Sequence, residues 1–157
     1  MIKYDKKIFN NCYDFAVMAH EGQKDKSGRD YIRHPLSVAD IVSHRYKYRL
    51  SEDALFTAEC VAMLHDVIED THNTISDLLN YGIPFEIASR VEILTRGEGE
   101  SYMNFVKRCG DDTIARCVKI CDLLHNMDLT RLDKITDEDF NRVKKYHKAY
   151  KYLEERD

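Results

Sequence analysis

Long apolar runs are missing from this chain of 157 residues, and no stretch comes near the roughly 18 apolar residues that a membrane-spanning helix needs. The first ten residues, MIKYDKKIFN, also lack the apolar centre of a secretory signal peptide. A membrane partner is therefore not expected, and the sequence predicts a cytoplasmic protein.

An excess of basic residues is missing too. Lys and Arg number 24 against 28 for Asp and Glu, which gives a net charge of −4. Proteins that bind DNA or RNA neutralise phosphates with surplus cations, so a nucleic-acid polymer is not expected as a partner. A small phosphorylated nucleotide is compatible with this charge, because a local cationic loop or a metal ion can hold it.

Several motifs that carry chemistry in other proteins do not occur. The chain has no GxxxxGK[ST] phosphate loop and no GxSxG nucleophile elbow. It has five cysteines, an odd number, and none of them forms a Cys-x-x-Cys pair. We therefore expect the cysteines to be small buried side chains in a reducing compartment, rather than zinc ligands or disulfides.

Proline and glycine are scarce, with two and six residues. Both interrupt helices, and the alternation typical of strands is weak, so the sequence predicts an all-α fold in a single domain over 1–157. A polar loop at 22–34 separates a helix at 5–21 from one that Pro35 leads. Further helices are expected at 51–68, 74–80, 84–95, 101–109, 111–132 and 137–157.

The segment 64–71, Leu-His-Asp-Val-Ile-Glu-Asp-Thr, brings ionisable groups to the end of an apolar helix. On a wheel of about 100° per residue, His65 and Glu69 fall on the apolar face. Asp66 and Asp70 lie at its shoulder. Burying such charges unpaired costs on the order of several kcal/mol each. A divalent cation removes that cost, whereas the simpler interpretation is a helix end whose acids are exposed to solvent.

Two residues elsewhere are placed to complete a metal site. His34 stands directly before Pro35, and Asp122 lies beside the apolar face of the helix at 111–132, one turn before Asn126. A histidine at a helix entry and a carboxylate beside an apolar stripe also occur in proteins without a metal. His125 lies on the apolar face itself, so we expect a core histidine rather than a ligand.

Four stretches together resemble the HD-domain phosphohydrolases, and specifically the hydrolase domain of the RelA/SpoT alarmone family and its small stand-alone relatives. They are residues 19–23 (AHEGQ), 26–36 (KSGRDYIRHPL), 64–71 (LHDVIEDT) and 118–127 (VKICDLLHNM). They occur in the family's order and span about residues 8–132. No synthetase domain is expected in a chain of this length.

The resemblance implies an all-helical HD-type bundle with one manganese ion, or another divalent metal, in its core. Four positions match the family's metal ligands: His34, His65, Asp66 and Asp122. Two match the catalytic acids that position or deprotonate the attacking water: Glu69 and Asp70. Four match nucleotide contacts: Lys26, Ser27, Tyr31 and Asn126.

The implied reaction belongs to the stringent response: hydrolysis of the 3′-pyrophosphate of guanosine tetra- or pentaphosphate (ppGpp or pppGpp) to GDP or GTP and pyrophosphate. Two alternatives stay open. One is an HD phosphohydrolase acting on another nucleotide, such as an adenine alarmone, NADPH or a nucleoside monophosphate. The other is a non-catalytic partner protein that binds metal or nucleotide. The presence of both Glu69 and Asp70 argues against the second, because a binder does not need these acids.

Three positions depart from the family pattern, one of them Leu129, where longer family members often carry a small polar residue. Asp25 precedes Lys26 where the family usually has arginine, and Leu123 follows Asp122 where it often has arginine. An aspartate can neither stack on a purine nor donate hydrogen bonds to it, so we expect weak discrimination between guanine and adenine. The sequence leaves the oligomeric state open.

Overall fold

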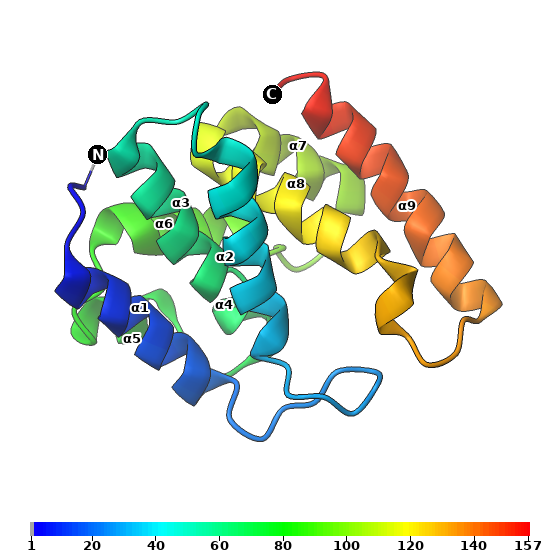
Figure 1. The fold of residues 1–157 in the computed structure, drawn as a ribbon, viewed down its shortest axis with the longest axis horizontal. Helices are drawn as coiled ribbons and strands as arrows, with labels where there is room; N and C mark the ends of the chain where they lie inside the picture. Colours follow the sequence, from blue (N-terminus) through cyan, green and yellow to red (C-terminus); the bar gives the residue numbers. More distant parts are fainter. Residues whose placement is uncertain (1) are drawn as a thin grey trace.

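The computed structural model describes residues 2–157, and its regular structure in that range is helical (Figure 1). The elements are α1 (Lys6–Ala19), α2 (Arg33–Tyr46), α3 (Glu52–Leu64), α4 (Val67–Asp70), α5 (Ile75–Asn80), α6 (Phe85–Leu94), α7 (Tyr102–Asp111), α8 (Thr113–Met127), the 3-10 helix η1 (Leu129–Arg131) and α9 (Asp137–Glu154). Within the described range, extended pairing is limited to one bridge between Lys24 and Asp30. The predicted all-α fold class is confirmed.

Side-chain caps determine where several helices begin. Ser51 accepts a hydrogen bond from the amide of Ala54 at the start of α3. Thr74 and Asp77 form a capping box at α5, and Thr136 and Asp139 form another at α9. Such caps satisfy amides that have no partner within the helix, and each is worth about 1 kcal/mol.

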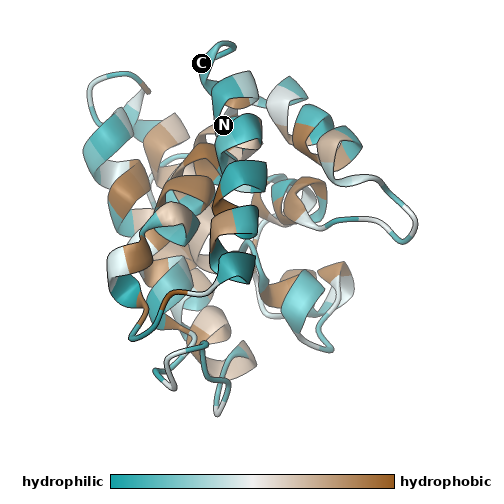
Figure 2. Cartoon of the chain, turned by 90° about the vertical axis from the view of Figure 1, so that its right-hand side faces the viewer, coloured by the Kyte–Doolittle hydropathy of each residue, from teal (hydrophilic) through white to brown (hydrophobic). Residues whose placement is uncertain are grey.

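Helix α3 lies at the centre of the bundle and packs against α1, α2, α6 and α8 (Figure 1). Most of its residues are buried, which explains why the helix is apolar nearly all round. A smaller apolar cluster joins α7, α8 and α9, and Leu123 is part of it. Figure 2 shows apolar residues gathered where helices face one another. No helix in the described range is both long and apolar enough to cross a bilayer.

The helix predicted over 51–68 is interrupted. The faces that a continuous helix would give to its last residues are therefore wrong. Helix α3 ends at Leu64, and His65 and Asp66 form a turn before α4. The carbonyl of Ala62 accepts a hydrogen bond from Nδ1 of His65 at 2.7 Å. An uninterrupted helix would offer that carbonyl to the amide of Asp66. Beyond the turn the predicted face no longer applies, and Glu69, expected on the buried face, is exposed.

The helix predicted over 111–132 is also shorter than expected. Helix α8 ends at Met127, and the side chain of Asp128 accepts from the amide of Thr130 to begin η1. The chain then turns into α9, which lies against α7 and α8 (Figure 1). This arrangement brings η1 and the first turn of α9 close to the loop between α1 and α2.

Candidate metal centre

Four side chains meet where α2, α8 and the turn between α3 and α4 come together. Nε2 of His34 lies 3.3 Å from Oδ2 of Asp66 and 3.2 Å from Oδ1 of Asp122. Nε2 of His65 lies 3.1 Å from Oδ2 of Asp66 and 3.6 Å from Oδ1 of Asp122. The structure therefore brings together the four residues that the sequence predicted as metal ligands.

The donor set fits a divalent cation. Ligand atoms of His34, His65 and Asp122 lie within 4.8 Å of one another, and all three residues are buried. Because Nδ1 of His65 is used by the carbonyl of Ala62, its Nε2 is the free ring atom. That buried atom makes no hydrogen bond within the described part of the chain. Imidazole nitrogen and carboxylate oxygen together suit several divalent metals, so the ligands do not single out manganese.

The charges of the cluster are tightly coupled. Burial lowers the pKa of His34 and His65, but the carboxylates of Asp66 and Asp122 outweigh it and hold both pKa values above the ordinary value for histidine. Conversely, burial raises the pKa of Asp66, but the imidazoles outweigh it and hold the pKa low. The imidazoles thus carry the positive charge that balances the acids, and a bound divalent cation could take that place.

Lys119, which the sequence analysis did not single out, is the direct countercharge of Asp122. Its Nζ lies 2.7 Å from Oδ2 of Asp122, three residues along α8. Burial raises the pKa of Asp122, but Lys119 and the imidazoles outweigh it and hold the pKa well below the ordinary value. Asn126 donates to Oδ1 of the same carboxylate at 2.5 Å. A lysine on a buried helix face needs an acidic partner, and that rule could have identified it from the sequence.

The two predicted catalytic acids lie at the rim and are held differently. Oε2 of Glu69 accepts a hydrogen bond from the backbone amide of Arg96 at 3.0 Å. Oδ2 of Asp70 lies 2.8 Å from the hydroxyl of Tyr31. Burial and the neighbouring acids raise the pKa of Tyr31, so the phenol keeps its proton and donates. The hydrogen bond from this phenol therefore holds the carboxylate of Asp70 in position.

A cavity of about 250 Å³ opens beside the candidate metal ligands. Its lining contains Glu69, Tyr31 and Asn126 together with three cations, Arg96, Lys119 and Lys145. Burial, Arg96 and Lys119 lower the pKa of Lys145, which reflects positive charge gathered in one place. Candidate metal ligands and cations that share one cavity suit an anion that contacts a bound cation and these side chains together.

Two of the predicted nucleotide contacts lie outside this cavity. Lys26 and Ser27 line a separate pocket with six residues between 132 and 139. Oγ of Ser27 donates to the carbonyl of Arg131 at 3.2 Å, and Nζ of Lys26 lies 3.6 Å from Oδ1 of Asp139. The carboxylate of Asp25 accepts from the amides of Ser27 and Arg29, at 2.9 Å each, and so closes the loop.

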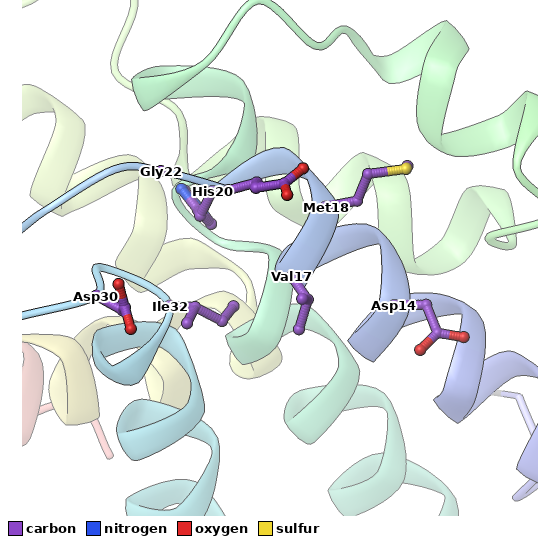
Figure 3. Close-up of a pocket in the computed structure, with 8 residues that line it drawn as sticks. Asp14, Val17, Met18, His20, Gly22, Asp30 and Ile32 are labelled. Carbon is purple, nitrogen blue, oxygen red and sulfur yellow. The ribbon is translucent and has the colours of Figure 1, made fainter.

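A larger pocket of about 480 Å³ lies at the end of α1 and the approach to α2 (Figure 3). Among the described residues, it shares none with the predicted site. Its lining combines apolar side chains, Val17, Met18 and Ile32, with acidic ones, Asp14, Glu21 and Asp30. This composition is unsuited to a phosphate, and the pocket is apart from the metal centre.

No protein-family model matches the chain. Among curated proteins, the chain is 31% identical over 134 residues to a GTP pyrophosphokinase rsh of Brucella melitensis, a match that covers 78% of this chain and 17% of that protein. It is 31% identical over 133 residues to the bifunctional (p)ppGpp synthase/hydrolase RelA of Mycobacterium tuberculosis, covering 80% of this chain and 17% of that protein. The chain thus spans less than a fifth of the length of these relatives.

One solved structure, described as a metazoan orthologue of SpoT that hydrolyses ppGpp, superposes with a TM-score of 0.74 at 22% sequence identity. The match covers 97% of this chain and 88% of that chain. At this identity the likeness shows the fold, which the two proteins share over almost their whole lengths.

Proposed function

The chain is a RelA/SpoT-type HD domain, and from that premise we propose that it hydrolyses the 3′-pyrophosphate of ppGpp or pppGpp, giving GDP or GTP and pyrophosphate. The observation that carries the proposal is the shared cavity. Its lining contains the candidate ligands His34, Asp66 and Asp122, the acid Glu69 and three cations. Hydrolysis of a pyrophosphate ester would use all of these: a divalent metal held by the candidate ligands, a base for the attacking water and positive charge around the pyrophosphate oxygens.

Manganese is proposed as the metal, on the resemblance to the RelA/SpoT hydrolases. A divalent cation, when bound, lowers the pKa of a water ligand and polarises a phosphoryl oxygen. His34, His65, Asp66 and Asp122 would hold it. Lys119 would keep Asp122 ionised and correctly turned, because it occupies the carboxylate oxygen that does not face the histidines.

Glu69 is proposed as the general base. The amide of Arg96 holds its carboxylate at the rim of the cavity, where it can take a proton from the attacking water. The new bond joins the water oxygen to the phosphorus next to the ribose. The bond from that phosphorus to the 3′ oxygen breaks, and this oxygen takes a proton from solvent. Arg96, Lys119 and Lys145 stabilise the charge on the departing pyrophosphate.

The nucleotide contacts divide into two groups. Tyr31 and Asn126 line the metal-side cavity and are proposed to orient the ester. Lys26 and Ser27 line the separate pocket beside η1, and we assign them to the part of the nucleotide remote from the scissile bond. Asp70 is proposed to assist Glu69 through its link to Tyr31.

A panel of nucleotides tests the proposal. Manganese-loaded protein is incubated with ppGpp, pppGpp, their adenine counterparts, NADPH and nucleoside monophosphates, and the released phosphate and pyrophosphate are measured separately. We expect pyrophosphate from the 3′-pyrophosphorylated nucleotides. Release of monophosphate from NADPH or a nucleoside monophosphate would favour another phosphohydrolase. Tight binding of ppGpp with no product would favour a binding protein. Replacing His65 by alanine should abolish both metal content and product.

A further inference from the structure

The two histidines of the metal centre have different partners behind their rings. Nδ1 of His65 bonds to the backbone carbonyl of Ala62 at 2.7 Å. Nδ1 of His34 instead lies 2.7 Å from Nδ1 of His125. Metal-binding histidines commonly place a carbonyl, a carboxylate or water at this position, which fixes the ring and its tautomer. In this protein the imidazole of His125 takes that position behind His34.

The number of protons on each imidazole shows which Nδ1 atom donates the hydrogen bond and which accepts it. Nε2 of His34 points to the carboxylates of Asp66 and Asp122, and it must be bare to bind a cation. A neutral imidazole carries one proton, so that of His34 is on Nδ1. The hydrogen bond between the two Nδ1 atoms then requires His125 to accept. His125 therefore has a bare Nδ1 and carries its own proton on Nε2.

The position of His125 is itself fixed from two sides. Its ring lies edge to edge with that of His34, with centroids 4.9 Å apart and planes 27° apart. On the other side Nη1 of Arg131 approaches the ring of His125, closest to Nδ1 and 3.0 Å from Nε2, and it donates to the carbonyl of His125 at 3.2 Å. His125 is thus half-buried beside the site, which corrects the expectation of a core histidine.

From this geometry we propose that His125 is a positioning residue for the metal centre. It accepts the Nδ1 proton of His34, and so turns Nε2 of His34 toward the cation. The inference rests on the metal site of the proposed function. His125 contacts the candidate ligand His34 and is not itself a candidate ligand. Its test can therefore fail while the proposed function stands.

The test compares three variants of His125 in the whole chain. Asn places its amide oxygen near the position of Nδ1 and can accept the proton. Gln places its oxygen near Nε2 instead, and Leu has no acceptor. We expect His125→Leu and His125→Gln to weaken Mn²⁺ binding by about 10- to 100-fold, the usual effect of losing such a partner. His125→Asn should remain within about threefold of the unchanged protein, because it restores the acceptor.

Metal affinity is measured by titration calorimetry, and the melting temperature of the metal-free protein is recorded for each variant. His147, exposed on α9, supplies the control: His147→Leu should leave affinity unchanged. Equal affinities for the Asn and Gln variants, or unchanged affinity in the Leu variant, would overturn the proposal. An unchanged protein that binds no Mn²⁺ would instead overturn the metal site on which it rests.

A second measurement reads the tautomers directly. In Zn²⁺-loaded protein with ¹⁵N-labelled histidine, long-range nitrogen–proton spectra distinguish a bare ring nitrogen from a protonated one. We expect His34 to be protonated on Nδ1 and His125 on Nε2. A proton on Nδ1 of His125 would contradict the assignment, because two protonated nitrogens cannot share this bond.

Discussion

The hydroxyl of Tyr31 lies between the carboxylates of Asp66 and Asp70, 2.7 Å from one and 2.8 Å from the other. Asp66 is a candidate metal ligand, and Asp70 is a candidate catalytic acid. One phenol therefore links the two parts of the site. Because it has a single proton, it donates to only one carboxylate at a time.

Removing that hydroxyl should slow hydrolysis without emptying the metal site. Hydrogen bonds to charged groups are worth about 1.5–3 kcal/mol. We therefore expect Tyr31→Phe to reduce kcat by about 10- to 100-fold, while metal content stays at the level of the unchanged protein. Initial rates and elemental analysis measure the two quantities. Tyr13→Phe, at an exposed tyrosine of α1, is the control. An unaltered kcat would show that the phenol does not organise the acids.

Neutralising Glu69 should separate metal binding from catalysis. Glu69→Gln keeps the shape of the side chain and its contact with the amide of Arg96, but it cannot take a proton. A general base typically contributes about 10²- to 10⁴-fold, so kcat should fall in that range with metal still bound. Glu98→Gln, in the same loop as Arg96 and exposed, should be harmless. Full turnover in Glu69→Gln would move the role of base to Asp70.

Lys119 should be essential for the stability of the metal-free protein. Removing one partner of a buried ion pair costs up to about 3–5 kcal/mol, and Asp122 would keep only its contacts with His34, His65 and Asn126 on the other carboxylate oxygen. We expect Lys119→Met to lose stability on that scale in urea unfolding. Combining it with Asp122→Asn should recover most of the loss but not metal binding. Lys107→Met, at an exposed lysine of α7, is the control. A loss below about 1 kcal/mol would mean that solvent already screens the pair.

Base discrimination should be weak. The carboxylate of Asp25 is occupied by the amides of its own loop, so this position offers a purine neither a stacking plane nor a donor. We expect kcat/KM for the guanine and adenine forms of the 3′-pyrophosphorylated nucleotide to agree within about tenfold, equivalent to about 1.4 kcal/mol. Competition assays with both substrates measure the ratio. A thousandfold preference for guanine would place base recognition elsewhere in the site.

The grouping of the candidate ligands could be expected from the sequence because part of the evidence is local. Each of His34, His65 and Asp122 stands at a helix entry, turn or apolar face where an ionisable group needs a partner. The fold class followed from the scarcity of helix breakers. The resemblance to the RelA/SpoT hydrolases added the link between distant stretches, which periodicity alone does not provide.

The break in the helix and the position of His125 could not be predicted, because they depend on contacts that a helical wheel does not represent. The break after Leu64 arises because the ring of His65 takes the carbonyl of Ala62, and a continuous wheel assumes that this carbonyl stays in the helix. Likewise, His125 faces His34 because α8 crosses the start of α2. A side chain from a helix can be assigned to a face from its spacing, but its partner on another helix is fixed only by packing.

Two of the candidate ligands lie far apart in the sequence: His34 is at the start of α2 and Asp122 is near the end of α8. A cation held by both would close a loop that contains most of the core, in the way that a crosslink does. At a hundred times its dissociation constant, such a ligand adds about 2.7 kcal/mol to stability. Metal supply would then govern how long a molecule resists proteolysis, so that copies without metal would be the first to be degraded.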